Sequence, residues 1–196
     1  MMKLPVCARD TGIYSGIFIS MLYLAAFRRL KAQKPPGIAV SVLLCILMLP
    51  MILDGTLSYA GLIDTDNAKR LYTELLFGLA LPFFLVPAAY YNAYGSNDKP
   101  VLKSVAELIP VYGTGVLVCM LLLKGVVPYL VASSIFLAGL LFLLVRVLYT
   151  ILARTRRFER GKIYLLSFSG TVLVLAALYL LSSLVLHPLK DILIAG

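Results

Sequence analysis

The sequence predicts an all-α, polytopic membrane protein with six transmembrane helices. Of its 196 residues, 61% are hydrophobic and 14% are charged, and the mean hydropathy is +0.97. Soluble domains contain roughly one half apolar and roughly one quarter charged residues, so a water-soluble fold is excluded. Six apolar segments, separated by short charged or turn-forming stretches, are each long enough to cross the hydrocarbon core as a helix. The whole chain, 1–196, is expected to form a single transmembrane domain.

The first three expected helices come from the apolar runs of the N-terminal half. The first, 11–27, follows the stretch LPVCARDTGIYSG and stops before a pair of arginines. The second, 38–57, begins after a Pro-Pro-Gly turn and carries Asp54 close to its end. The third, 71–91, follows a polar segment. Charges and turn residues therefore set all three boundaries.

The other three expected helices follow in the C-terminal half. The fourth, 105–123, has Glu107 in its first turn, and the fifth, 126–152, has Arg146 about two turns before its end. The sixth, 163–186, follows the basic stretch ARTRRFERGK. Glu107 and Arg146 lie at similar expected depths from the same side of the membrane, so we expect them to form a structural ion pair.

The distribution of basic residues predicts the orientation. The first, third and fifth connections contain eleven Lys and Arg residues, whereas the N-terminus, the second and fourth connections and the C-terminal tail contain six. Connections rich in Lys and Arg stay in the cytoplasm. Both termini of this multi-pass protein are therefore expected on the extracytoplasmic side of the cell membrane.

The net charge of +9 does not indicate nucleic-acid binding, because the basic residues occur in short clusters between apolar runs. Such clusters act as topology signals and contact anionic lipids, so membrane lipids and no nucleic acid are the expected partners. No nucleophile–base pair or glycine-rich phosphate loop stands out, so an enzyme is unsupported and the cofactor is unknown. Cys45 and Cys119 lie among Leu and Val and are expected to be small apolar fillers. His187 is expected to be solvated at the outer interface.

The polar residues of the first half gather at one interface. With the termini outside, the start of the first helix, the end of the second and the start of the third all reach the outer surface. Asp54 lies next to a long apolar run, where a carboxylate is costly unless it is paired or hydrated, and Arg9 or Arg70 is its natural partner. Arginine binds carboxylates and phosphates bidentately, so the cluster suits an anionic or zwitterionic ligand. The candidate ligand-binding residues are Arg9, Asp10, Tyr14, Asp54, Asn67 and Arg70.

Other interpretations of these residues stay open. The charges could form an ion-pair network that holds the first three helices together, and Asp10 could instead cap the first helix. Cys7, Asp10 and Asp54 offer one thiolate and two carboxylates, but the nearby arginines would oppose a bound cation. No metal site is therefore predicted.

The stretch LPVCARDTGIYSG resembles the signature of an uncharacterised membrane-protein family, domain of unknown function 2085. The resemblance continues through LPMILDGTLSYAG and DTDNAKRLYTELLFG and covers about the first 90 residues of the sequence. Where the family pattern has a second cysteine this chain has Asp10, which places a thiol-based metal or redox site in doubt. The resemblance implies where a site lies and not what it does. The matching positions are Cys7, Ala8, Arg9, Thr11, Gly12, Tyr14, Asp54, Gly55, Asn67, Arg70 and Gly78.

The expected function is binding or transport of a small anionic or zwitterionic solute. Arg9 and Arg70 would hold the anionic group, and Asp10 and Asp54 would hold the arginines in place. One alternative is a non-catalytic structural membrane subunit with protein partner subunits, whose ion pairs are purely structural. Another is a membrane enzyme that acts on lipid-linked substrates. A pocket lined by the two arginines and Asp54 would favour ligand binding, and dry packing around them would favour the subunit.

Overall fold

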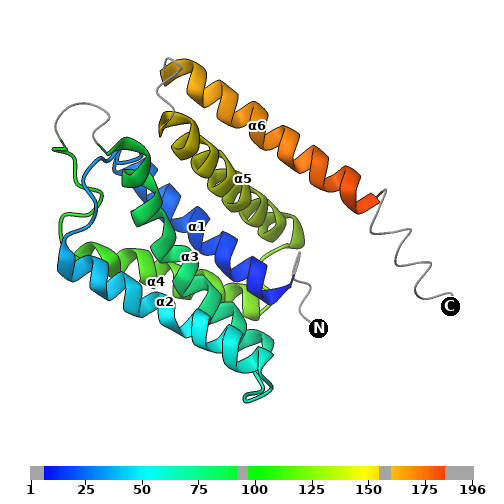
Figure 1. The fold of residues 1–196 in the computed structure, drawn as a ribbon. Helices are drawn as coiled ribbons and strands as arrows, with labels where there is room; N and C mark the ends of the chain where they lie inside the picture. The colour runs from blue at the N-terminus through cyan, green and yellow to red at the C-terminus, as the bar shows by residue number, and fades with distance from the viewer. Residues whose placement is uncertain (1–6, 92–96, 155–159, 184–196) are drawn as a thin grey trace. The chain divides into compact units, whose positions relative to one another are not determined.

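The computed structural model describes residues 7–91, 97–154 and 160–183, which are predominantly helical (Figure 1). The predicted all-α class is confirmed. Within these ranges, extended pairing is limited to an isolated bridge between Lys34 and Pro100. The elements are α1 (Ala8–Ala26), α2 (Ile38–Tyr59), α3 (Asn67–Tyr90), the short 3-10 helix η1 (Val105–Glu107), α4 (Leu108–Leu123), α5 (Tyr129–Arg154) and α6 (Arg160–Leu181).

Five of the described helical segments, with η1 counted together with α4, are long and apolar enough to cross a membrane. The exception is α1, which has Arg9 and Asp10 in its first turn and contains several small polar residues. Ten of its nineteen residues are buried. Because neighbouring helices cover α1, it needs less apolar surface than a helix that faces lipid. The outer faces of α2 and α4 expose many large apolar side chains, as expected where a helix contacts hydrocarbon.

Small residues bring α1 and α3 into close contact, and the two helices lie side by side in Figure 1. Gly12 and Gly16 of α1 lie against the backbone of α3. A Cβ atom added to Gly16 would lie only 2.7 Å from both the carbonyl oxygen of Leu75 and the amide nitrogen of Leu79. One turn further, the hydroxyl of Ser20 donates a 2.7 Å hydrogen bond to the carbonyl of Leu79. This spacing of small residues is the close-packing pattern typical of membrane helices.

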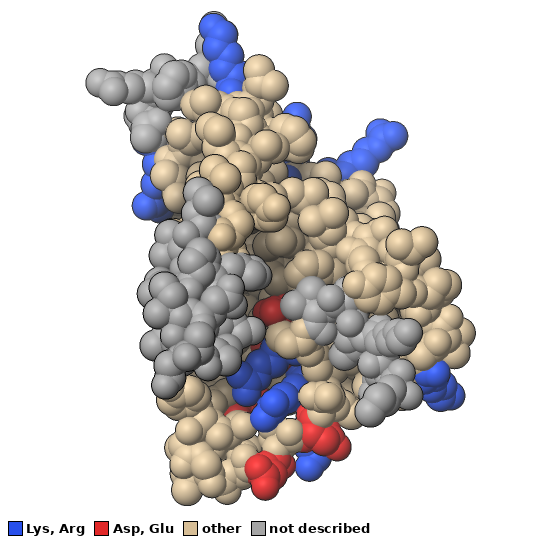
Figure 2. Space-filling view, turned by 90° about the vertical axis from the view of Figure 1, so that its right-hand side faces the viewer, with Lys and Arg blue, Asp and Glu red and all other residues tan. Residues whose placement is uncertain are grey.

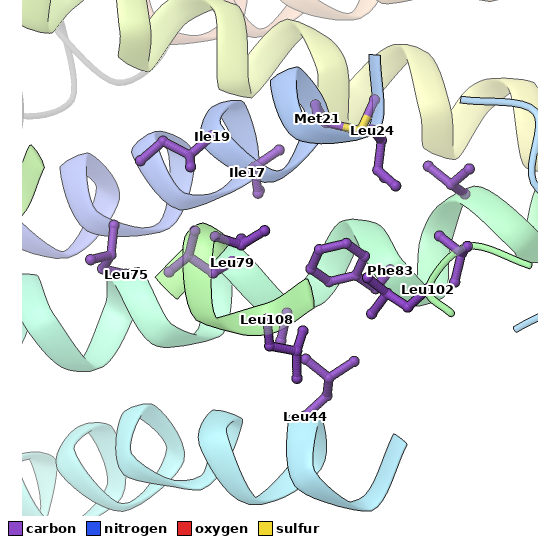
Figure 3. Close-up of a cluster of buried hydrophobic side chains, with 14 of the residues drawn as sticks. Ile17, Ile19, Met21, Leu24, Leu44, Leu75, Leu79, Phe83, Leu102 and Leu108 are labelled. Carbon is purple, nitrogen blue, oxygen red and sulfur yellow. The ribbon is translucent and has the colours of Figure 1, made fainter. Parts of the chain in front are cut away.

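The apolar core lies where α2 and α4 pack onto the α1–α3 pair (Figure 3). Leucine, isoleucine and phenylalanine side chains from all four helices interdigitate there, and burial of this apolar surface holds the helices in register. The buried side chains include Ile17, Ile19, Met21 and Leu24 of α1, Leu44 of α2, Leu75, Leu79 and Phe83 of α3 and Leu108 of α4.

The two cysteines in the middle of helices differ in their surroundings. Cys119 is buried in the core, as predicted for a small apolar filler. Cys45 is exposed, so the prediction that it fills space between helices is wrong. Its neighbour Leu44 takes the buried position, and a helix turns by about 100° from one residue to the next.

The chain divides into two compact units, Met1–Leu143 and Leu144–Gly196. The second unit contains the end of α5 and α6. Within it, the rings of Tyr149 and Tyr164 pack with their centroids 4.5 Å apart. His187 lies outside the described residues, and the single transmembrane domain stays a prediction.

Glu107 has a partner that the sequence did not predict, and its expected pairing with Arg146 stays a prediction. The guanidinium of Arg29, in the connection after α1, donates two hydrogen bonds to the Glu107 carboxylate, at 2.5 Å from Nη1 to Oε2 and 3.0 Å from Nη2 to Oε1. The backbone amide of Lys103 donates a further one at 3.1 Å. This pairing depends on how the first connection folds against η1, and helix depth alone does not encode it.

Candidate functional site

The stretch CARD forms the start of α1. Cys7 is the N-cap residue, and its Sγ accepts a hydrogen bond from the Asp10 backbone N–H at 3.4 Å. The Cys7 S–H donates in return to Oδ2 of Asp10 at 3.0 Å. Because Cys7 is the N-cap, the alternative in which Asp10 is itself the cap is wrong. Partial burial, followed by the hydrogen bond to the Asp10 carboxylate, raises the pKa of the Cys7 thiol.

Three charged side chains from three helices lie next to this helix start. Arg9 of α1, Asp54 of α2 and Glu74 of α3 are called here the buried charged cluster. Asp54 is 6% exposed and Glu74 is 3% exposed. Arg9, Asp54 and Asp10 all act electrostatically on the Glu74 carboxylate. Gly12 allows α1 to approach at this point, because a Cβ atom added to it would lie 2.9 Å from the Cβ of Glu74.

Each member of the buried charged cluster has a polar atom without a hydrogen-bond partner. These atoms are Nε of Arg9, Oδ2 of Asp54 and Oε2 of Glu74. Among the described residues, no ion pair within 4.0 Å involves any of the three. A buried ion without a close partner costs several kcal/mol. Polar atoms from α1, α2 and α3 that could each accept or donate a further hydrogen bond therefore gather at one place in the bundle.

Arg70, one of the two arginines expected as a partner of Asp54, bonds to other groups. Its Nε donates to the hydroxyl of Thr65 at 2.9 Å, and its Nη2 donates to the hydroxyl of Ser58 at 3.1 Å. Ser58 lies in the last turn of α2, and Thr65 lies in the connection between α2 and α3. The guanidinium of Arg70 therefore links the start of α3 to the end of α2 and to the connection between them.

The remaining predicted site residues lie at the edge of the cluster or outside it. Asn67 is exposed as the first residue of α3. Tyr14 packs edge-on against Phe136, with ring centroids 5.0 Å apart, and still interacts electrostatically with Asp10. Of the six predicted residues, the structure brings Arg9, Asp10 and Asp54 together, places Tyr14 beside them, and directs Asn67 and Arg70 elsewhere.

Glu74 is the charged residue that sequence reasoning left out of the predicted site. It lies four residues after Arg70 and four before Gly78, on one face of α3. A carboxylate one turn inside an apolar segment was the available signal. Its burial is evident only once α1 packs against α3, since the same position would be hydrated on an isolated helix end.

Figure 2 shows acidic and basic side chains beside one another at the lower end of the displayed face, below a largely uncharged middle part. In the part of the chain that the structure describes, no group of three or more His, Cys, Asp or Glu is placed to hold a metal ion.

Long apolar helices with lipid-compatible outer faces and charged residues on the inside define a multi-pass α-helical membrane protein. Residues 1–84 match the model of the family described as "Predicted membrane protein (DUF2085)". The resemblance predicted from the opening stretch is therefore confirmed over residues 1–84.

Two curated proteins are similar to parts of the chain. An uncharacterized protein of Methanocaldococcus jannaschii is 32% identical over 92 residues, which are 47% of this chain and 57% of the relative. An uncharacterized protein of Methanothermobacter thermautotrophicus is 37% identical over 78 residues, which are 39% of this chain and 65% of the relative. The chain thus covers less than two thirds of the length of either relative. No solved structure matches the chain.

Proposed function

We propose that this membrane protein binds a small zwitterionic solute at the buried charged cluster and acts as a receptor or carrier for it. The observation that carries the proposal is the set of three unpartnered buried atoms on Arg9, Asp54 and Glu74. Ionisable side chains inside membrane proteins are costly, and where they do not pair with one another they mark binding or transport sites. A solute between α1, α2 and α3 would supply the missing partners.

The signs of the charges narrow the solute class from anionic or zwitterionic to zwitterionic. Arg9 stands against three carboxylates, those of Asp10, Asp54 and Glu74, whereas Arg70 is engaged with neutral hydroxyls. A purely anionic solute would meet more negative than positive charge. A zwitterion can place its carboxylate or phosphate on the Arg9 guanidinium and its cationic group beside the carboxylates.

A structural membrane subunit is the second candidate, and a different observation favours it. Gly12 and Gly16 bring the backbones of α1 and α3 together beside the cluster. The three cavities with volumes of about 630, 400 and 390 Å³ are lined by residues other than Arg9, Asp54 and Glu74. If no water or solute reaches the cluster, its charges would serve only to hold α1, α2 and α3 together.

A thermal-shift experiment separates the two candidates. The full chain, purified in detergent, is heated with glycine betaine or with common α-amino acids, and with choline or acetate, which carry only one of the two charges. We expect at least one zwitterion to stabilise the protein, by about 2.7 kcal/mol at a hundredfold excess over its Kd, and the single-charge probes to have no effect.

Variants connect this stabilisation to the cluster. Arg9→Gln and Asp54→Asn should each remove the shift, and Lys69→Gln, exposed at the same end of α3, should retain it. Solute binding is refuted if no zwitterion stabilises the protein, or if the shift persists in both cluster variants. A structural role in holding the helices together would then be supported if Glu74→Gln lowers the thermal midpoint of the solute-free protein, because neutralising one member of a buried charged network leaves the others uncompensated.

A further inference from the structure

An apolar groove of about 630 Å³ lies between α1 and α4, toward the end of α1 that is remote from the buried charged cluster. Three of the lining residues on each of these two helices are spaced four apart, so they form one line along each helix. These residues are Phe18, Leu22 and Ala26 of α1 and Pro110, Thr114 and Val118 of α4.

The groove runs along the helix axes. From Phe18 to Ala26, α1 rises about 12 Å at about 1.5 Å per residue. Leu22 is 57% exposed and Phe27, at the end of the groove, is 56% exposed, so the groove opens outward. A long apolar groove parallel to membrane helices has the direction that acyl chains take in a bilayer.

The groove ends at a basic pocket. Phe27 lines both the groove and a second cavity of about 400 Å³. Glu107, at the same end of the groove, is paired with Arg29 and also acts electrostatically on Lys103. Even with Glu107 and Asp98 counted, the four basic side chains leave an excess of positive charge. The charged residues that line the basic pocket are Arg28, Arg29, Lys99, Lys103 and Asp98.

Backbone hydrogen bonds fix the two connections that carry these basic residues. The amides of Gln33 and Lys34 donate to the carbonyl of Lys99 at 2.9 and 3.0 Å, and the amide of Val101 donates to the carbonyl of Lys34 at 3.1 Å. Nη1 of Arg29 donates to the carbonyl of Val101 at 3.3 Å. These hydrogen bonds hold the backbone of both basic connections in place before any ligand binds.

Arg28 adopts a backbone conformation that favours glycine. Its φ is 56°, in the left-handed region. The amide of Arg28 donates to the carbonyl of Ala25 and the amide of Arg29 donates to that of Leu24, which are the two bonds of a Schellman motif. Glycine is the usual residue at this position because a side chain there is strained. An arginine held in this conformation at the rim of a basic pocket points to a use for its side chain.

We propose that the groove and the basic pocket together bind one membrane phospholipid with an anionic headgroup. The phosphate lies among Arg28, Lys99 and Lys103, and one acyl chain occupies the groove between α1 and α4. The basic side chains favour an anionic headgroup through charge complementarity, and the apolar groove favours the acyl chain because its apolar surface is buried there. The orientation predicted from the basic connections places this end in the cytoplasmic leaflet, where anionic lipids attract basic segments. This site does not depend on the solute proposed for the other end of α1.

The test is lipid titration of the full chain in detergent, followed by native mass spectrometry. Dioleoyl phosphatidylglycerol is compared with dioleoyl phosphatidylcholine, which has the same chains, and with glycerol 3-phosphate, which has the phosphate alone. We expect one phosphatidylglycerol per chain, at least about tenfold preference over phosphatidylcholine, and no binding of glycerol 3-phosphate in the same range.

Three variants locate the lipid. The double change Lys99→Gln and Lys103→Gln should lower phosphatidylglycerol affinity by about fivefold for each lysine and leave phosphatidylcholine unaffected. Thr114→Phe should weaken both lipids because it fills the groove. Arg28→Gly should raise the thermal midpoint of the lipid-free protein and lower phosphatidylglycerol affinity. Lys124→Gln, exposed just after α4 at its other end, is the charge-matched control and should bind as the unchanged protein does.

Several results would overturn the proposal. Equal affinity for the two phospholipids would remove the headgroup argument, and glycerol 3-phosphate binding as tightly as the lipid would reduce the site to a phosphate pocket. Unchanged phosphatidylglycerol binding in the double lysine variant, with an unchanged thermal midpoint, would place the lipid elsewhere. Binding of a second copy of the chain in the groove in place of lipid would also refute it.

Discussion

Replacing Gly16 by alanine should push α1 away from α3 and destabilise the helix bundle. The added Cβ atom would lie 2.7 Å from the carbonyl oxygen of Leu75, 2.7 Å from the amide nitrogen of Leu79 and 2.8 Å from the carbonyl carbon of Gly78. All three are backbone atoms, which cannot rotate aside as a side chain can. Ordinary van der Waals contact begins at 3.4 Å, so the two helices must separate by several tenths of an ångström.

Three terms set the magnitude. Overpacking a close interface costs about 1–3 kcal/mol. Separation also stretches the 2.7 Å hydrogen bond from Ser20 to Leu79, and its loss costs about a further 1 kcal/mol. Alanine offsets about 1 kcal/mol through its higher helix propensity. The expected loss in the free energy of unfolding for Gly16→Ala is therefore about 1–3 kcal/mol.

The matched control is Gly113→Ala in α4. No atom lies within 4 Å of a Cβ atom built at Gly113, so this change should be neutral or stabilising by up to about 1 kcal/mol. Both variants can be compared by reversible unfolding in mixed micelles with increasing dodecyl sulfate, followed by helical circular dichroism. Equal stability of Gly16→Ala and Gly113→Ala would refute the close-packing argument.

Two other outcomes are expected. In a chain whose other two cysteines are replaced by alanine, Asp10→Asn should speed the alkylation of Cys7 by iodoacetamide near pH 8. The reason is that the Asp10 carboxylate helps to raise the pKa of the thiol and thereby lowers its thiolate fraction. An unchanged rate would show that the hydrogen bond between Cys7 and Asp10 has no effect on the reactivity of the thiol. In intact cells, a membrane-impermeant thiol reagent should label Asn67→Cys but not Lys31→Cys, two exposed positions at opposite ends of the helices. Lys31→Cys should be labelled only after the membrane is permeabilised. The reverse pattern would contradict the orientation with both termini outside.

The helix ends show how far local sequence reasoning reaches. The predicted third helix began at position 71, where the apolar run begins, whereas α3 begins at Asn67. The polar first turn is helical because Oδ1 of Asp66 caps it, accepting the amide of Lys69 at 2.7 Å. Likewise α1 begins at Ala8 and not at 11, because Cys7 and Asp10 form its cap. Hydropathy locates a membrane helix, and capping residues locate its ends.

The charged residues mark the limit of that reasoning. Asp54 was predicted as a costly carboxylate near a helix end, and it is buried. Of its two expected partners, Arg70 instead bonds to the hydroxyls of Thr65 and Ser58, whereas Arg9 lies in the cluster. Glu74 also belongs to the cluster, although it was not among the predicted site residues. Which charged groups meet depends on the rotation of each helix about its axis. That rotation cannot be read from hydropathy and residue spacing alone.

The sequence by itself determined the class of the protein, the approximate course of its helices and the N-terminal part that resembles a known family. These properties follow from local quantities, namely the length of apolar runs, turn residues and a family signature within the first 84 residues. Tertiary structure alone decided that Glu107 pairs with Arg29, that Glu74 is buried against Gly12, and that an apolar groove leads to a basic pocket. Each of these features joins residues far apart in the chain, and their contact depends on how closely neighbouring helix backbones pack.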